Sequence, residues 1–425
     1  MENKPEKQPD PRRHARRLTV AARKGYNVSM AVVGTLARGA APLSGKLREL
    51  SGNFRRSAPP FSLWVHACSV GEMTVARRFI DCWRGKTGQD RIFLTAWTRD
   101  GHRIAESRSQ PGETVAWFPL DSRAAMRRAY DAVQPKAVIL CEAELWPNHL
   151  AEAQARGIPV FVINGRMSEG DEAKYRRLGS LASDFFAVPD TVFAQSEQDA
   201  RRFSSLGAHR TFVTGNMKFD ELQESRDKAQ KTKGFSELLY ILAASTHRGE
   251  EASVLRAFMR GRAKHPDLKL VIAPRHVKRS AAVAYLARQH GLRAQLWSRR
   301  KSVRDADCVV VDQVGLLPSL YAHARLAFVG KSLHARGGQN FLEAVEAGCP
   351  VVVGPHTENF EHMLAPFKSS NSVCQIAHTE ELAGAFAALL DDDPKRAETV
   401  ATARRVMREQ SGATELTVRE ILSRL

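Results

Sequence analysis

Short apolar runs alternate with amphipathic stretches along most of the chain. An apolar run ended by glycine or a polar residue is typical of a buried strand, and apolar positions three and four apart are typical of a helix covering a sheet. The strands expected in the first half are 61–67, 91–96, 114–118, 137–141, 159–163, 191–194 and 211–214. The helices expected among them are 72–84, 122–132, 145–155, 171–182 and 196–206.

A charged stretch separates this first series from a second one. Residues 221–236 hold few apolar positions, which predicts a linker. The strands expected beyond it are 238–244, 268–273, 308–312, 325–329, 350–353 and 372–376, and the helices are 249–263, 278–290, 340–347 and 379–390. Alternation of strand and helix predicts a mostly parallel sheet with helices on both faces. Each series should therefore form one doubly wound, Rossmann-like α/β domain.

The end of the chain has a helical pattern with no strand after it. We expect a helix over 394–425, whose apolar stripe needs a partner surface. The stripe consists of Val418, Ile421, Leu422 and Leu425. The expected domains are 59–220 and 237–393, with a cleft between them and the last helix packing back across both. Two such domains are typical of the GT-B type of glycosyltransferase, in which ligands bind at the carboxyl ends of strands.

Positive charge is concentrated at the start of the chain. The net charge is +18, and residues 1–58 carry thirteen Lys or Arg against four acids. This excess suggests an anionic surface nearby. Residues 26–42 are less polar, but their uncharged run, 25–37, is too short for a membrane span and ends at Arg38. They predict either a short surface helix or an interfacial helix on anionic lipid. No nucleic-acid module is recognisable, and we expect no nucleic-acid partner.

The six cysteines lie mostly in apolar strand-like runs, and no C-x-x-C spacing occurs. This usage predicts reduced thiols in a cytosolic compartment, with neither a disulfide framework nor a zinc site. No D-x-D sequence stands near the motifs described below, so we expect no catalytic metal.

A polar, glycine-containing loop between residues 328 and 360 leads from an apolar run directly into a helical segment. Free N–H groups and the dipole at a helix N-terminus favour an anion, and adjacent glycines let a ligand approach the backbone closely. An ordinary glycine-rich loop is the alternative, but the ordered set of residues favours a nucleotide-phosphate site. That set is Ser332, Gly337, Gly338, Asn340 and Glu343, followed by Gly354-Pro355-His356.

Acidic residues follow two expected strands of the first domain. Glu72 opens a helix after 61–67, where its carboxylate can accept a proton from a substrate hydroxyl, and we expect the helix dipole to keep it ionised. A plain helix-capping acid is the alternative. Glu142 and Glu144 stand at the mouth of the same sheet, after 137–141.

In the second domain, hydroxyl and cationic groups follow two strands. Ser245 and Thr246 end a strand and offer hydroxyl and N–H donors. Arg275 follows a strand and Pro274, where a guanidinium can clamp a phosphate.

These motifs occur in an order that resembles one family. The chain contains S-V-G-E, E-x-E-L-W-P-N, N-x-R-x-S, G-N-x-K-F-D, S-T-H-x-x-E-E, A-P-R-H and G-G-Q-N-x-L-E with G-P-H-T-x-N-F, all within about residues 60–420. It thereby resembles the 3-deoxy-D-manno-octulosonic acid (Kdo) transferases of lipopolysaccharide synthesis. The resemblance implies an inverting GT-B enzyme that moves Kdo from CMP-Kdo to a lipid A precursor, lipid IVA, without a metal or other cofactor.

The resemblance also implies roles for single residues. Glu72 would be the base, and Lys218 with Glu142 or Glu144 would assist the transition state. CMP would be held by Pro274 and Arg275, by the loop around Gly315, and by the run Asn340, Phe341, Leu342 and Glu343. Ser245, Thr246, Ser332 and Gly338 complete the expected donor-binding set.

The chain departs from the family in two places. The usual apolar N-terminal anchor is weak here and follows a charged extension, and Leu316 stands where the family tends to have an acid. The resemblance places the protein at the cytoplasmic face of the bacterial inner membrane. Two alternatives stay open: a GT-B transferase using another sugar nucleotide, and a basic, non-catalytic binding protein of the same fold. Intact Glu72, Lys218, Arg275 and Glu343 argue against the second.

Overall fold

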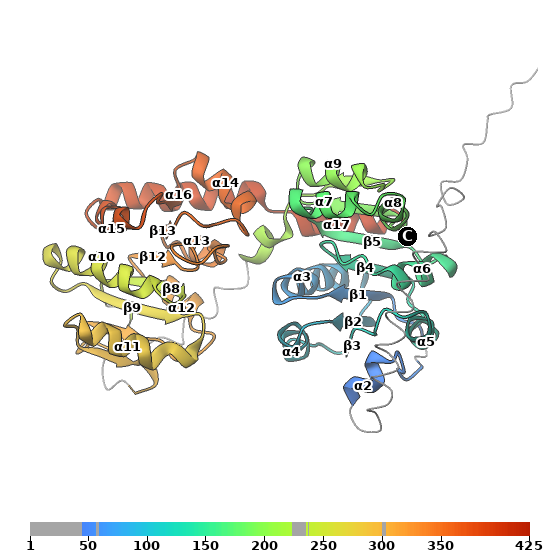
Figure 1. Ribbon diagram of the computed structural model, residues 1–425, viewed down its shortest axis with the longest axis horizontal. Helices are drawn as coiled ribbons and strands as arrows, with labels where there is room; N and C mark the ends of the chain where they lie inside the picture. The colour runs from blue at the N-terminus through green and yellow to red at the C-terminus, as the bar shows by residue number, and fades with distance from the viewer. Residues whose placement is uncertain (1–44, 57–58, 223–234, 237, 300–302) are drawn as a thin grey trace, which may run out of the picture. The chain divides into compact units, whose positions relative to one another are not determined.

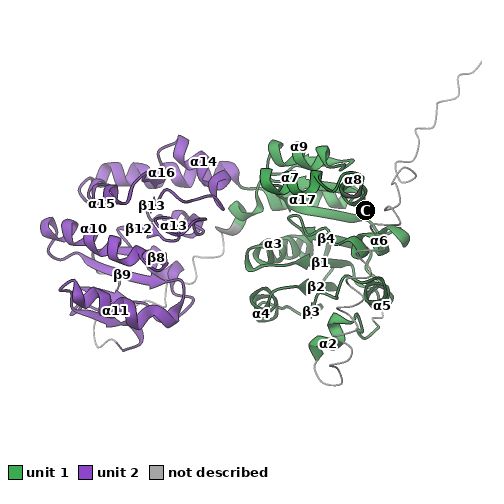
Figure 2. Cartoon of the chain, viewed as in Figure 1, with its two compact units in different colours: residues 1–220, 411–425 green, residues 221–410 purple. Residues whose placement is uncertain are grey.

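The chain folds into two compact units. The computed structural model describes residues 45–56, 59–222, 235–236, 238–299 and 303–425. Unit 1 runs to Asp220 and takes up the chain again at Ser411–Leu425, whereas unit 2 is Glu221–Gln410 (Figure 2). The expected membrane-associating segment and most of the expected linker lie outside the described residues.

Unit 1 is built on a parallel sheet. In the described part of the chain this sheet has seven strands in the order β3-β2-β1-β4-β5-β6-β7. The strands are β1 (Leu63–Ala67), β2 (Ile92–Ala96), β3 (Glu113–Trp117), β4 (Ala137–Cys141), β5 (Val160–Gly165), β6 (Thr191–Ala194) and β7 (Thr211–Val213). Because β1 pairs with β2 on one side and β4 on the other, the chain reverses direction across the sheet beside β1.

Helices cover both faces of this sheet (Figure 1). They are α2 (Gly45–Leu50), α3 (Val70–Thr87), α4 (Arg99–Ser107), α5 (Arg123–Val133), α6 (Pro147–Ala155), α7 (Glu169–Arg176), α8 (Ser180–Phe186), α9 (Glu197–Ser205) and α17 (Ala413–Leu422). Val65 packs in one core with Phe79 of α3, while its neighbour Trp64 packs in the other with Met126 of α5. Successive strand residues thus feed opposite cores, which is why the strands read as continuous apolar runs.

Most helices of unit 1 begin at a side-chain cap. The hydroxyls of Ser69, Thr98, Ser122, Ser168 and Ser196 each accept a backbone N–H of the first turn. Such caps satisfy donors that a helix leaves free and commonly stabilise it by about 1 kcal/mol. They fix where the helices start relative to the strand ends.

The expected single helix over 394–425 is wrong. The chain forms α16 (Asp393–Gln410) in unit 2 and α17 in unit 1, separated at Gly412, whose φ is 104°. Asp220 accepts the N–H groups of Gly412 at 2.5 Å and Thr414 at 2.6 Å. Val418 of the predicted stripe enters the core beside α3.

Unit 2 repeats the architecture. Among its described residues, the sheet has seven parallel strands in the order β10-β11-β9-β8-β12-β13-β14. They are β8 (Tyr240–Thr246), β9 (Lys269–Pro274), β10 (Ala294–Leu296), β11 (Cys308–Val310), β12 (Leu326–Val329), β13 (Val351–Val353) and β14 (Cys374–Gln375). The α-helices are α10 (Glu250–Lys264), α11 (Ser280–Gln289), α12 (Leu317–Tyr321), α13 (Leu342–Ala347), α14 (Glu361–Ser369), α15 (Leu382–Leu390) and α16.

The differences from the expected elements concern short or interrupted segments. Strand β10 and helices α2, α4, α12 and α14 were not expected, and the helix expected over 171–182 is divided into α7 and α8. Gly179, at φ 55°, sits at that break as the N-cap of α8. In the described residues no helix is long and apolar enough to span a bilayer.

Candidate active site

Four predicted side chains of unit 1 come together at the carboxyl edge of its sheet. Glu72 lies in the first turn of α3 after β1, Glu142 and Glu144 follow β4, and Lys218 lies on the 3₁₀ helix η2 (Met217–Leu222) after β7. Lys218 Nζ donates to Glu142 Oε1 at 2.8 Å, and both side chains are about one-fifth exposed. The charges of Glu142 and Glu144 also act on one another and on Glu72. We call these four residues the carboxylate–lysine cluster.

The Glu72 carboxylate is held by the residues that precede α3. One carboxylate oxygen accepts the N–H of Cys68 at 2.8 Å, and the other accepts the Ser69 hydroxyl at 2.7 Å and the Ser69 N–H at 3.3 Å. Ser69 in turn caps α3, completing a reciprocal capping box. The side chain is fixed and only 7% exposed.

The acidity of the cluster differs from expectation. We expected the helix dipole to keep Glu72 ionised, but burial raises its pKa, the charge of Glu142 adds to the rise, and the bonds from Ser69 and Cys68 oppose it. Burial, and then the charge of Glu72, raises the pKa of Glu144 to about 7. Desolvation outweighs the dipole because these carboxyls lie below the surface. A raised pKa suits a group that must take up a proton near neutral pH.

Asn164 was not among the predicted site residues, although it begins the N-x-R-x-S motif at the end of β5. Its Oδ1 accepts the N–H of Met217 at 2.9 Å and so positions the residue before Lys218. Next to it, Ile163 accepts the N–H of Glu142 at 2.9 Å. Asn164 and Glu142 have φ of 52° and 58°, a left-handed conformation that non-glycine residues adopt at a cost, often at functional sites. The polar N-x-R-x-S motif at the end of an expected strand was the sequence feature that could have pointed to Asn164.

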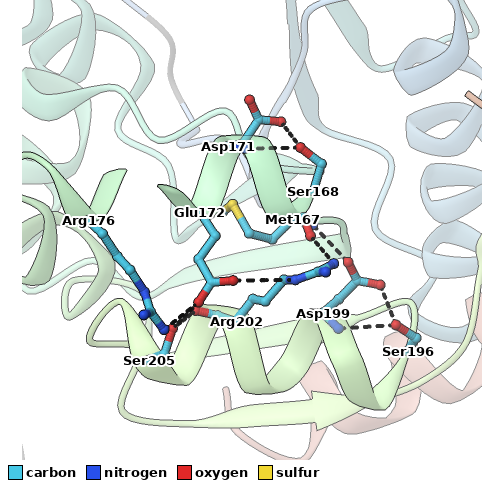
Figure 3. Close-up of polar contacts among 9 residues, drawn as sticks. All are labelled: Met167, Ser168, Asp171, Glu172, Arg176, Ser196, Asp199, Arg202 and Ser205. Carbon is cyan, nitrogen blue, oxygen red and sulfur yellow. Dashed lines mark hydrogen bonds and ion pairs between the residues drawn. The ribbon is translucent and has the colours of Figure 1, made fainter. Parts of the chain in front are cut away.

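Two side chains of α9 hold the loop after Asn164 by hydrogen bonds to its backbone (Figure 3). Asp199 accepts the N–H of Met167 at 2.8 Å, and Arg202 donates to the carbonyl of Met167 at 2.9 Å. Ser168 caps α7 by accepting the N–H of Asp171 at 3.1 Å. Both backbone groups of Met167 are thus bonded to α9, which ties the loop after Asn164 to that helix.

In unit 2, the predicted residues at the ends of β8 and β9 are joined by one backbone hydrogen bond. The N–H of Arg275 donates to the carbonyl of Thr246 at 3.0 Å, so the two strand ends are tied together. Thr246 is buried and its hydroxyl donates to Glu251 at 2.9 Å, which leaves it a role inside the unit. Ser245 has φ 53°. Pro274 is buried, whereas the Arg275 side chain is exposed and can reach a ligand.

The start of the predicted phosphate loop is organised by a buried carboxylate. Glu250 of α10 accepts the N–H groups of Lys331, Ser332 and Leu333 at 2.8, 2.9 and 3.0 Å. The Ser332 hydroxyl donates to Val329 and accepts the N–H of Gly354. The Ser332 hydroxyl therefore holds the loop in shape through bonds to the protein itself.

The glycines of this loop are favoured by their backbone conformation. Gly337 and Gly338 have φ of 117° and 72°, and a Cβ on Gly337 would lie 2.5 Å from Asn359. Asn340 Oδ1 accepts the N–H of Leu342, which opens α13. Asn359 can move aside, but a side chain at a φ of this sign strains the backbone whatever the space, so the conformation favours glycine at both positions. Both N–H groups are bonded inside the unit, that of Gly337 to Glu358 and that of Gly338 to the carbonyl of Lys331, at 2.8 Å each.

The remaining predicted donor-site residues divide by burial. Phe341 packs edge-on against Phe367, with ring centroids 5.3 Å apart, and Leu342 is also buried, so both side chains face the core. Glu343 is partly exposed in the first turn of α13, and Gly315 has φ 85° with open space around it. Of this group, Glu343 and the backbone at Gly315 are the parts accessible to a ligand.

No group of three or more His, Cys, Asp or Glu within the described ranges is arranged to hold a metal ion. All six cysteines are free. Burial raises the pKa of Cys68 to about 12, which leaves this thiol beside Glu72 protonated at neutral pH.

Comparisons with known proteins agree with the two units. Residues 42–221 match the family described as 3-deoxy-D-manno-octulosonic-acid transferase, and residues 223–406 match glycosyl transferases group 1. A solved UDP-GlcNAc 2-epimerase from Neisseria meningitidis superposes with a TM-score of 0.60 at 14% identity, covering 85% of this chain and 99% of that one. This likeness concerns the fold and confirms the predicted GT-B type.

Two relatives match this chain in sequence over more than two thirds of both lengths. The 3-deoxy-D-manno-octulosonic acid transferase of Bordetella pertussis is 34% identical over 70% of this chain and 72% of its own. That of Haemophilus influenzae is 29% identical over 84% of this chain and 86% of its own. The expected glycosyltransferase is thus confirmed, and the chain belongs to the 3-deoxy-D-manno-octulosonic acid transferase family.

Proposed function

We propose that this protein transfers Kdo from CMP-Kdo to a lipid A precursor, lipid IVA, with inversion at the anomeric carbon. The observation that carries the proposal is the carboxylate–lysine cluster, in which buried Glu72 has a raised pKa beside the ion pair of Glu142 and Lys218. An inverting transfer needs one base on the acceptor side, and Glu72 is the carboxylate whose position is fixed most firmly.

The proposed step is a single displacement. Glu72 takes the proton of an acceptor hydroxyl while the hydroxyl oxygen bonds to the anomeric carbon of Kdo. The bond from that carbon to the phosphate oxygen breaks, and CMP leaves with the electron pair. The Lys218 ammonium, held by Glu142 at 2.8 Å, offers positive charge to the reacting carboxylated sugar.

We assign the donor to unit 2. The exposed Arg275 guanidinium would pair with the phosphate of CMP. The N–H groups of Gly337 and Gly338 already donate to Glu358 and to the carbonyl of Lys331, so we assign these glycines to the shape of the loop and not to phosphate contact. A guanidinium can stabilise the charge of a phosphate leaving group without a metal, and we propose that this enzyme uses no metal or other cofactor.

We further propose that the protein works at the cytoplasmic face of the inner membrane. The basic segment 1–58 would bind anionic lipid and bring the enzyme to its lipid-linked acceptor. Removing residues 1–24 should weaken binding to anionic vesicles, most clearly at low salt. Equal binding with and without the segment would contradict this assignment.

The function is tested by incubating the full chain with CMP-Kdo and a tetra-acylated lipid A precursor. Mass spectrometry should show one or more Kdo increments on the lipid. A thermal-shift comparison checks the nucleotide, because CMP and not UDP should raise the melting temperature. Protection by UDP, together with no Kdo increment, would favour a transferase using another sugar nucleotide.

A further inference from the structure

Aromatic side chains gather beside the carboxylate–lysine cluster. Trp97 follows β2, Phe118 follows β3, and Trp146 precedes α6, so all three lie at the carboxyl edge of the unit 1 sheet. The ring centroids of Trp97 and Trp146 are 5.5 Å apart at 41°, and each ring also packs against Phe118, at 6.5 and 5.5 Å. Both indoles therefore pack against the buried ring of Phe118.

One residue links this aromatic group to Glu72. The carbonyl of Cys68 accepts both the hydroxyl of Thr98, at 2.7 Å, and its N–H, at 3.2 Å. The N–H of the same Cys68 donates to Glu72 at 2.8 Å. Because Thr98 follows Trp97 directly, the indole is placed at a fixed position relative to the proposed base.

The second indole is joined to the cluster directly. Trp146 Nε1 donates to Glu144 Oε2 at 3.0 Å. A carboxylate and an aromatic surface thus meet at one edge, with hydrogen-bond acceptors on one side and an apolar surface on the other.

Trp97 is unusually exposed for a tryptophan of this protein. Its side chain is 36% exposed, whereas Trp64, Trp83 and Trp297 are at most 3% exposed. It belongs to none of the motifs that carry the family resemblance. An exposed indole beside a polar site is what ligand recognition uses, since aromatic rings dominate binding surfaces while a few polar groups set orientation.

The neighbouring groups indicate which ligand fits. An acyl chain would take the carboxylates beside the platform out of water and offer them no hydrogen bond in exchange, which is costly. A pyranose ring instead presents C–H bonds on one face and hydroxyls around its rim. Those C–H bonds suit an indole face, and the hydroxyls can donate to Glu144.

We propose that Trp97 and Trp146 form a stacking platform for a sugar ring of the acceptor, placing its attacking hydroxyl at Glu72. This inference rests on the proposed function for the identity of the acceptor, a hexosamine disaccharide carrying phosphates and acyl chains. Trp97 is then a positioning and specificity-determining residue, which acts on the acceptor and not on the donor.

The first test separates acceptor from donor kinetics. Trp97→Ala should raise the KM for the lipid acceptor about tenfold or more, while the KM for CMP-Kdo stays within about twofold. Trp97→Phe, which keeps a ring, should recover most of the loss, and Trp97→Leu, which keeps only apolar bulk, should not. Tyr285→Ala serves as the matched control, because Tyr285 is 60% exposed on α11 of unit 2.

A second measurement does not depend on Kdo transfer. Calorimetry with a phosphorylated glucosamine disaccharide lacking acyl chains should show binding to the full-length protein that weakens about tenfold or more in Trp97→Ala. If the wild type transfers no Kdo but this difference remains, the proposed function fails and the platform stands. An unchanged acceptor KM in Trp97→Ala, full recovery by leucine, or no disaccharide binding to the wild type at millimolar concentration would each overturn the platform.

Discussion

Replacing Glu72 with glutamine should abolish most turnover while leaving the fold nearly intact. Glutamine has the size of glutamate but cannot take up the acceptor proton, and a positioned base commonly contributes ~10²–10⁴ in rate. That range equals about 2.7–5.4 kcal/mol of transition-state stabilisation. We expect kcat to fall by at least that factor and the affinity for CMP to stay near that of the wild type.

The contacts of Glu72 allow the stability effect to be worked out. The glutamine oxygen can still accept the N–H of Cys68, and its amide can donate to the Ser69 hydroxyl, which can reverse its role. Only the longer bond from the Ser69 N–H, at 3.3 Å, then loses its acceptor. That loss costs about 1 kcal/mol or less, and removing a carboxylate whose pKa is raised by burial offsets it.

The assay is the rate of Kdo increments by mass spectrometry across pH, alongside melting temperatures. The wild-type rate should fall as pH drops through the raised pKa of Glu72, and the glutamine variant should lack this limb. Ser69→Ala is the matched control: it keeps the carboxylate but removes a bond that lowers the pKa, so its acidic limb should move to higher pH. If Glu72→Gln kept most of its turnover, the reasoning would be refuted, and the base would have to be sought at Glu142 or Glu144.

Three further changes test other parts of the structure. Glu144 has a pKa raised to about 7, so the stability it confers in its neutral form is present below about pH 4.5 and lost as pH rises through 7; Glu144→Gln should raise the melting temperature at pH 8 but not at pH 4. Arg275→Ala should weaken CMP binding by about 1.5–3 kcal/mol in calorimetry, and equal affinity would reject the phosphate contact. Asp220→Ala should cost about 1 kcal/mol and speed amide exchange in α17, since two N–H groups lose their acceptor. Activity that vanished with EDTA and returned with magnesium would contradict the metal-free proposal.

The strand–helix alternation could be predicted because it depends on local periodicity. Buried parallel strands such as β4 and β8 are apolar throughout, and their ends are marked by polar motifs. Strand β10 escaped prediction, because its three residues form a strand through pairing with β11 and not through an apolar run of their own. The order of strands in each sheet likewise depends on contacts between distant segments.

The sequence predicted which residues lie together at the candidate site but not how deeply they are buried. Motifs after strands predicted that Glu72, Glu142 and Lys218 would lie together, since carboxyl ends of parallel strands share one edge. The raised pKa of Glu72 could not be foreseen, because it follows from burial by the surrounding fold. Ser332 shows the opposite limit: its type suited a phosphate site, yet Val329 and Gly354 occupy its hydroxyl.

The membership of α17 in unit 1 has a consequence for synthesis on the ribosome. Unit 1 is almost complete when Asp220 is made, but the face of α3 that Val418 and Ile421 later cover is then open. Residues 221–410 must be translated first, which at about 5–20 residues per second takes roughly 10–40 s. During that interval the nascent protein exposes an apolar surface that chaperones can bind. Its first half therefore finishes folding only after its second half has been made.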